Sequence, residues 1–235
     1  KPRRLAAEEI RDSMLFVSGE LNSQMGGIPI RPEINLEVAL QPRQVMGSFA
    51  ASYEASKTPE QRNRRSVYAH KIRGLRNPFF EVFNQPSPDL SCEARDSSTV
   101  TPQAFALFNS EDTLKRSIAL AVDLIEKTAT RKDAIKEIFN RAYGRAPSTS
   151  ESRLCIKHWN AMKKRHEGLS FEPTTYPQSV KREAVEEMTG ESFTFVEKLV
   201  AYKDYTPDIE FADIDPNTRA LAEVCLVVFN SNEFL

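Results

Sequence analysis

The sequence predicts a mainly α, irregular multi-helix domain of about seven helices, with long ordered loops and room for one short strand pair. Apolar residues recur at helical spacing through most of the second half of the chain. Residues that cap helices precede several of these runs. Glycine is scarce, with 8 in 235 residues, which disfavours turn-dense β architectures. The length suits a single domain, 1–235, whose possible halves are a polar-loop half, 1–109, and a helical half, 110–235.

The first half contains one clear helix and several irregular segments. Ile10, Met14 and Val17 recur at helical steps and predict a helix over 3–21, which Gly26-Gly27 ends. The rest of this half is predicted as an ordered loop with at most a helical turn over 28–59, a short strand or extended segment over 64–73, and one or two helical turns over 78–83.

Capping residues begin the helices of the second half. A hydroxyl or carboxylate at an N-cap accepts hydrogen bonds from the free N–H groups of the first turn. These signals predict helices that begin after Ser110, Thr130, Ser148 and Asp215. Further helices are predicted over 102–108, 177–190 and 195–200. The side chains expected to point inward are Leu154, Cys155, His158, Trp159 and Met162 in one helix and Leu221, Val224, Cys225 and Val228 in the last.

The charge balance and the motifs exclude several kinds of chemistry. With 32 Lys and Arg against 33 Asp and Glu, the chain has a net charge of -1 and lacks the basic excess typical of proteins that bind nucleic acid. No apolar run approaches the roughly 18 residues that cross a bilayer. A glycine-rich phosphate loop and the H-E-x-x-H spacing of a zinc site are both absent, so we predict no metal site.

Three cysteines lie far apart in the sequence, at Cys92, Cys155 and Cys225. We predict that they are buried small apolar groups, because free cysteine is among the most buried residue types. One disulfide with a spare thiol is the alternative.

The polar stretch of residues 91–109, which lies between two apolar regions, is the candidate site. Arginine and carboxylate groups there can form charge-assisted hydrogen bonds, and the short hydroxyl side chains favour local backbone bonding. We predict an internal polar brace, with a ligand or partner surface as the alternative and catalysis as a third. Arginines in the RRSVYAHKIR segment serve the same brace or bind an acidic ligand. The candidate residues are Arg64, Arg65, Tyr68, Cys92, Arg95, Asp96, Thr99, Gln103 and Asn109.

Five blocks occur in the order seen in one known family. They are RRLAAEEIRDSMLFVSGELNSQMGG, RRSVYAHKIR, SCEARDSSTVTPQAFALFNSE, IFNRAYGRAPS and RALAEVCLVVFNSNEF. The chain therefore resembles the C-terminal planctomycete-specific domain of unknown function of the planctomycete cytochrome C proteins. The resemblance implies a portion of a longer exported, multidomain protein with a c-type haem in its upstream part and genes associated with polysaccharide breakdown. It implies no cofactor and no catalytic residue within this chain.

The function predicted from this resemblance is an interaction module that docks the upstream domains of the same precursor. One alternative is part of an enzyme site for sulfated or acidic polysaccharide, built from Arg95, Asp96, Tyr68 and Gln103. The other is a redox-partner surface for a c-type haem domain.

Overall fold

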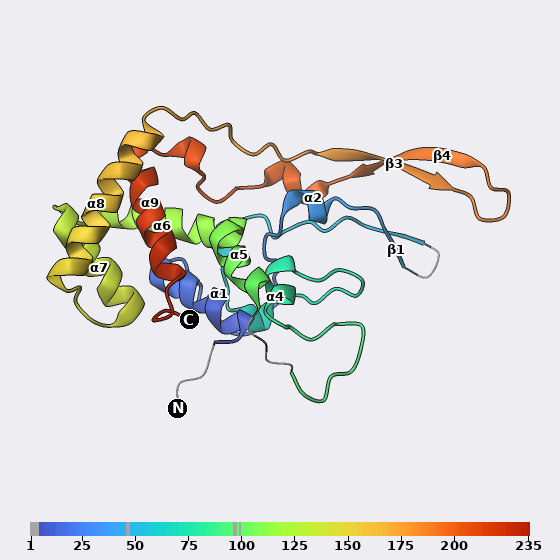
Figure 1. Cartoon of the computed structure of the whole chain (residues 1–235). Coiled ribbons are helices and arrows are strands. Elements are labelled where there is room, and N and C mark those ends of the chain that lie inside the picture. Colours follow the sequence, from blue (N-terminus) through green and yellow to red (C-terminus); the bar gives the residue numbers. More distant parts are fainter. Residues whose placement is uncertain (1–4, 46–47, 96–97, 99) are drawn as a thin grey trace.

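A helical body and a projecting β-hairpin make up the molecule (Figure 1). The computed structural model describes residues 5–45, 48–95, 98 and 100–235, and in this part it contains nine α-helices and two antiparallel sheets of two strands. The prediction of a mainly α fold is confirmed. Nine α-helices replace about seven, and a second strand pair is present. No helix in the described ranges combines the length and apolar character needed to cross a membrane.

The body consists of seven helices. Side chains of Ser110, Thr130, Ser148 and Asp215 accept hydrogen bonds from first-turn N–H groups, so these four predicted helix starts are confirmed. The first helix is shorter than predicted because Gly19, with φ +82°, ends it in the left-handed conformation. The seven helices are α1 (Ala7–Ser18), α4 (Pro78–Val82), α5 (Thr101–Asn109), α6 (Glu111–Lys127), α7 (Arg131–Tyr143), α8 (Thr149–His166) and α9 (Pro216–Phe229).

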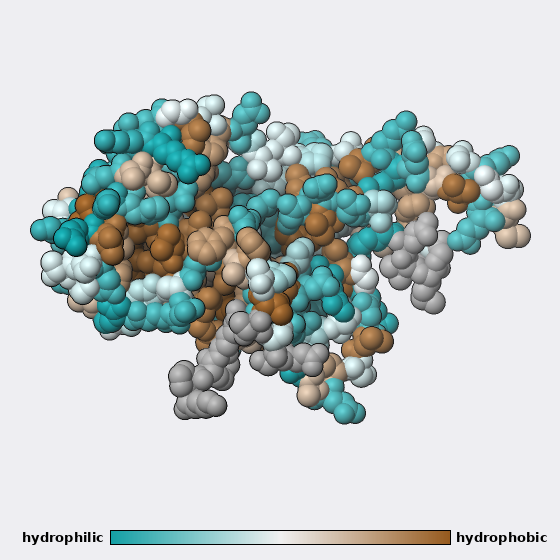
Figure 2. All heavy atoms as spheres, in the orientation of Figure 1, coloured by the Kyte–Doolittle hydropathy of each residue, from teal (hydrophilic) through white to brown (hydrophobic). Residues whose placement is uncertain are grey.

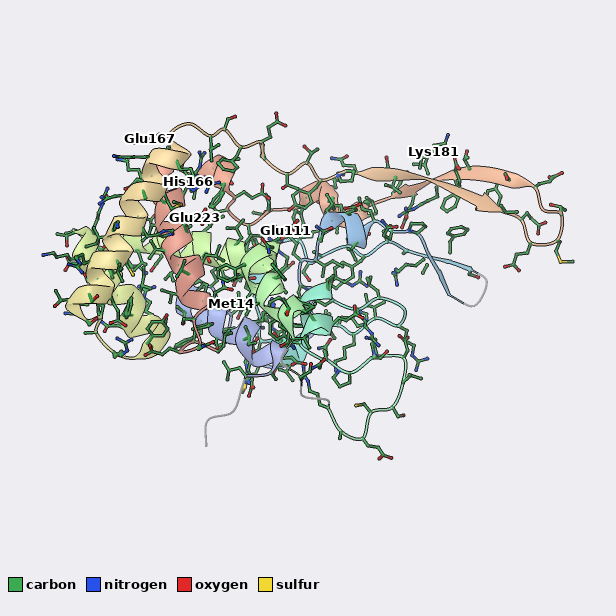
Figure 3. The ribbon with its side chains drawn as sticks, in the orientation of Figure 1. Met14, Glu111, His166, Glu167, Lys181 and Glu223 are labelled. Atoms are coloured by element: carbon green, nitrogen blue, oxygen red, sulfur yellow. The ribbon has the colours of Figure 1, made fainter. Side chains whose placement is uncertain are left out.

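The apolar core lies around α9, which packs against α6 and α8. Leu221, Cys225 and Phe229 of α9 are fully buried, and Trp159 of α8 donates its indole N–H to the carbonyl of Asn217 at 3.0 Å. The side chains predicted to be buried in α9 are confirmed as buried. Met14 of α1 belongs to the same cluster, so the core takes residues from both sides of position 110 (Figure 3).

The segment between α1 and α4 is more regular than the predicted loop. It holds α2 (Leu36–Ala39), β1 (Arg43–Val45), β2 (Ser48–Ala50), α3 (Pro59–Arg62) and a 3-10 helix (Ser66–Tyr68). The expected strand over 64–73 is instead this 3-10 turn between single bridges that pair Arg64 with Asn22 and Ala69 with Ile30. Tyr53 and Ala55 form a small second core there.

The two helices predicted over 177–190 and 195–200 are wrong. The chain there forms a hairpin of β3 (Ser179–Val185) and β4 (Ser192–Lys198), followed by a 3-10 helix (Val200–Asp204). Arg182 and Ala184 are buried while their strand neighbours are exposed, which is the alternation of a half-buried strand. Gly190 adopts φ +73° in the turn, which a glycine permits without strain. We call residues 179–198 the arm; a short 3-10 helix (Phe211–Asp213) then leads into α9.

Two expectations about burial also need correction. Leu154, predicted to point inward, is 57% exposed on the outer side of α8. All three cysteines are free, but only Cys225 is buried; Cys155 is half-buried and Cys92 is exposed in a loop. Cys92 escapes burial because its loop lies outside the helical core, where no apolar stripe draws it inward.

Candidate functional site

A group of buried arginines forms the most polar interior region of the described chain. Arg11, Arg62 and Arg116 are each at most 2% exposed, although arginine is almost never fully buried unless paired. Arg62 and Arg116 bind opposite oxygens of the Asp208 carboxylate, with Arg62 Nη2 2.7 Å from Oδ1. Arg116 also donates to Glu20 Oε1 at 2.7 Å. We call these five residues the arginine network.

The network joins segments that are far apart in the sequence. Arg11 Nη2 donates to the carbonyl of Arg62 at 2.9 Å. Arg62 donates in turn to the carbonyls of Ser56 and Thr206, at 3.0 and 2.9 Å. Because buried polar groups need partners, Arg11 and Arg62 satisfy carbonyls that would otherwise lack a donor, while Arg116 donates to carboxylates. The arginines therefore hold α1 and α6 against the segments 56–66 and 206–208.

Burial and charge shift the pKa values within the network. Burial opposes ionisation of Asp208, but Arg116 and Arg62 outweigh it and hold the pKa of this carboxyl below its ordinary value of 3.8. At Glu20 the effect of burial exceeds that of Arg116, so its pKa is raised. Burial lowers the pKa of Arg116, and the carboxylates of Glu20 and Asp208 more than offset this, so the value rises. Asp208 is thus the anion that stabilises two buried cations.

A pocket of about 210 Å³ opens beside the network, with both polar and apolar residues in its lining. Glu33 Oε1 accepts from Lys115 Nζ at 2.9 Å and from the Tyr176 hydroxyl at 2.5 Å. Its other oxygen, Oε2, is buried without a hydrogen-bond partner and lies 4.0 Å from Arg62 Nε. Amide side chains supply donors and acceptors around the opening, so the pocket can accept a small polar molecule. Asn35, Asn77 and the predicted site residue Asn109 are among its lining.

Arg64, a predicted site residue, fastens the loop of residues 22–30, which we call the clasped loop. Its guanidinium donates to the carbonyls of three alternate residues, Gln24, Gly26 and Ile28. It also lies 4.3 Å from the ring centroid of Tyr68, whose hydroxyl accepts from the Gly26 N–H at 3.0 Å. Arg64 and Tyr68 therefore fix the backbone of this loop from two sides.

The neighbouring Arg65 has a different environment. Its side chain is 55% exposed, and its Nε lies 3.9 Å from Asp12 Oδ2. Arg65 therefore faces solvent while Arg64 is buried, although the two are adjacent in the sequence.

Two other predicted site residues brace the end of α4. Arg95 donates to the carbonyls of Asn84 and Phe83 and to Glu8 Oε2, at 3.0, 3.2 and 2.8 Å. Gln103 donates to the carbonyl of Val82 at 3.0 Å. Both side chains thus satisfy backbone groups where this short helix ends.

The remaining predicted residues do not join either group. Asn109 donates to the carbonyl of Phe105 at 2.9 Å and lines the pocket beside the arginine network. Cys92 is exposed, and its thiol donates to the carbonyl of Ala94. Asp96 and Thr99 lie outside the described residues. The structure therefore brings Arg64 together with Tyr68 and Arg95 together with Gln103, in two separate places.

The arginine network itself did not follow from the sequence reasoning. One signal could have indicated it: Arg116 stands four residues before Leu120 and eight before Leu124, on the apolar stripe of α6. A charged residue within an apolar stripe needs a buried partner. The partner, Asp208, lies 92 positions away, and nothing in the sequence links the two.

His166 is a buried polar side chain outside the arginine network. Neither of its ring nitrogens has a hydrogen-bond partner in the structure, and Nε2 lies 3.4 Å from Glu223 Oε1 across the contact between α8 and α9 (Figure 3). The rings of Phe171 and Phe211 lie 5.9 and 5.4 Å from the imidazole. Within the described ranges, no three His, Cys, Asp or Glu side chains gather in a way that could hold a metal ion.

Comparison with known proteins identifies a family. No curated protein and no solved structure matches the chain. One family model does match, over residues 1–159, which include α1 to α7 and most of α8. The arm and α9 lie beyond the matched range. The chain therefore belongs to the PSD1 family, described as proteins of unknown function (DUF1553).

Proposed function

We propose that the chain is an interaction module that docks the upstream domains of its own polypeptide. That polypeptide is an exported protein of the cytochrome C type, with a c-type haem in its upstream part and a role in polysaccharide utilisation. The observation that supports docking is the clasped loop. Arg64 holds its backbone, while two of its large apolar side chains, Met25 and Ile28, are 78% and 85% exposed.

Two features of the clasped loop favour binding: its exposed apolar side chains and its fixed backbone. Each large apolar side chain left in water forgoes about 1.5–3 kcal/mol of burial free energy. A loop that is already fixed loses little conformational entropy when a partner binds. Exposed apolar side chains on a fixed backbone therefore favour binding, whereas the same side chains on a mobile loop would bind more weakly.

The surface around the loop extends this apolar character. An open hollow of about 530 Å³ borders the loop and includes Ile28 in its lining. Phe16 of α1 and Val67 of the adjoining 3-10 helix are 71% and 72% exposed. The lining of the hollow also includes the exposed Glu60 and the amide side chains of Gln24 and Gln61, so a partner meets exposed apolar side chains beside a polar rim.

Photo-crosslinking in the full polypeptide tests this proposal. Ile28 is replaced by the photoreactive residue benzoylphenylalanine, and mass spectrometry locates the crosslinked peptide. We expect a crosslink to an upstream domain of the same polypeptide. Leu90, 78% exposed on another loop, is the matched control and should give no such crosslink. Equal crosslinking from both positions, or none from position 28, would contradict the proposed docking surface.

A further inference from the structure

The arm extends away from the body and lacks a partner over its outer part. Its base is fixed to the rest of the molecule: Arg182 donates to the carbonyl of Leu40 at 2.7 Å, Glu197 Oε1 accepts from the Ser52 N–H at 2.6 Å, and the rings of Phe49 and Phe195 lie 5.5 Å apart. Among the described residues, the hydrogen bonds of residues 185–193 stay within the arm. A two-stranded ribbon is marginally stable alone in water, so a surface that covers it would stabilise it.

The outer arm has one sign of charge and an exposed apolar tip. From 183 to 196 the sequence holds four Glu and no Lys or Arg. Glu183, Glu187 and Glu191 are exposed, and no ion pair joins them to another described residue. Met188, in the turn, is 91% exposed. An occupant of this tip must therefore offer positive charge around an apolar contact.

Helix α8, at the end of the molecule opposite the arm tip (Figure 1), offers positive charge beside an exposed apolar side chain. In α8, residues 152–166 contain five Lys and Arg and no Asp or Glu. Arg153, Lys157 and Lys164 recur at steps of four and seven and share one exposed helical face, without an ion pair to any described residue. Leu154 lies beside this row and is 57% exposed. The outer arm and this face of α8 therefore have opposite charge.

We propose that the outer arm docks on the basic face of α8 in a second copy of this chain. The glutamates of the tip lie against Arg153, Lys157 and Lys164, and Met188 packs on Leu154. Figure 1 places α8 and the arm tip at opposite ends of the molecule, and Figure 2 shows mostly hydrophilic residues over the outer arm. Since the two surfaces differ, the contact is heterologous and propagates head to tail into rings or open chains. This surface is separate from the clasped loop.

Sedimentation velocity of the whole chain at low and high salt tests the contact. Interactions between exposed charges are screened within about 10 Å at 0.1 M salt and within about 3 Å at 1 M. At about 20 mM salt we therefore expect the weight-average mass to rise to at least twice the 26.6 kDa of one chain, and to return to it at about 0.5 M. A wild-type chain that remains a monomer at low salt and high concentration overturns the proposal.

Charge reversal at each surface makes the test specific. Variant one carries Glu187→Lys and Glu191→Lys; variant two carries Lys157→Glu and Lys164→Glu. Each should be a monomer alone, because the two reversed side chains then face residues of like charge on the other surface. An equimolar mixture should associate again, because the native arm of variant two meets the native α8 face of variant one, and the reversed arm of variant one meets the reversed face of variant two.

Controls separate this result from altered solubility or folding. Lys71→Glu with Lys203→Glu reverses two exposed lysines outside α8 and should leave association unchanged. All variants should keep the helical circular dichroism of the wild type. Association that survives in either reversed variant, or a mixture that stays monomeric, contradicts the contact. Salt-dependent retention on heparin that depends on Lys157 and Lys164, with no self-association, would assign the face to a polyanion instead.

Discussion

Asp208 shows how one residue determines the stability of a polar interior. Its carboxylate is 7% exposed and lies between two guanidinium groups that are almost fully buried. A buried ion pair contributes little net stability compared with an apolar pair, but removing one partner leaves an uncompensated buried charge. Removing the Asp208 carboxylate would therefore leave the buried charges of Arg62 and Arg116 uncompensated and destabilise the fold.

Replacing this carboxylate by an amide should be strongly destabilising. We expect Asp208→Asn to lower the free energy of unfolding by about 3–5 kcal/mol in urea denaturation. Asp204→Asn is the matched control: its side chain is 69% exposed and pairs with Lys57 at the surface, so the loss should be below about 1 kcal/mol. Equal losses in both variants would refute the role given to the network.

The same residue predicts a dependence on pH. Its folded pKa lies below the ordinary 3.8, so its stabilising contribution is fully present above that value and is lost as pH falls through the folded pKa. Melting temperatures measured from pH 6 to pH 2.5 should fall for the wild type below about pH 4. Asp208→Asn should show a smaller decrease, and a curve parallel to the wild type would exclude Asp208 as a source of the acid sensitivity.

Arg64 and Arg65 provide a natural matched pair for the clasped loop. Arg64→Ala removes the donor of three loop carbonyls and should cost about 1–3 kcal/mol, while the amides of residues 22–30 exchange faster with deuterium. Arg65→Ala removes an exposed arginine and should change both quantities little. If the loop exchanges at the same rate in both variants, Arg64 does not hold it.

At the scale of elements, capping side chains predicted four helix starts, whereas contacts between distant segments determine the structure of the arm. The starts at Ser110, Thr130, Ser148 and Asp215 follow from side-chain caps, which act within one turn. The arm was predicted as helix because Pro177 and Gly190 fit the start and the end of a helix, and because the apolar residues over 195–200 fit helical spacing. Its strand form depends on contacts with Ser52 and Phe49, about 130–145 positions away, which no local pattern reveals.

The same division applies to the candidate site. Arg64, Tyr68, Arg95 and Gln103 were predicted as an internal brace or a binding surface, and their contacts are internal. These residues bond to backbone within about 45 positions, whereas the network depends on pairs such as Arg116 and Asp208 that meet only in the folded chain. The polar stretch was visible in the sequence, and the network was not.

The position of α9 predicts its importance among the helices. Leu221 is fully buried between α6 and α8, so Leu221→Ala should cost about 2–5 kcal/mol and lower the unfolding midpoint. Val227→Ala removes a side chain that is 50% exposed on the same helix and should cost about 1 kcal/mol or less. Calorimetry of both variants checks this, and similar midpoints would place α9 at the edge of the cooperative unit.

The whole molecule combines a fixed interior with three exposed surfaces. The apolar core around α9 and the arginine network hold the body together. The clasped loop presents Met25 and Ile28, and the arm and α8 face present opposite charges at the two ends of the molecule (Figure 1).

Hydrogen–deuterium exchange of the clasped loop tests docking most directly. The exchange of residues 22–30 is compared between this chain alone and the same residues within the full polypeptide, with residues 84–95 as the internal control. We expect at least tenfold slower exchange of the loop in the full polypeptide and unchanged exchange of the control. A tenfold change corresponds to about 1.4 kcal/mol of stabilisation of the loop by the bound domain. Equal exchange of the loop in both proteins would contradict it.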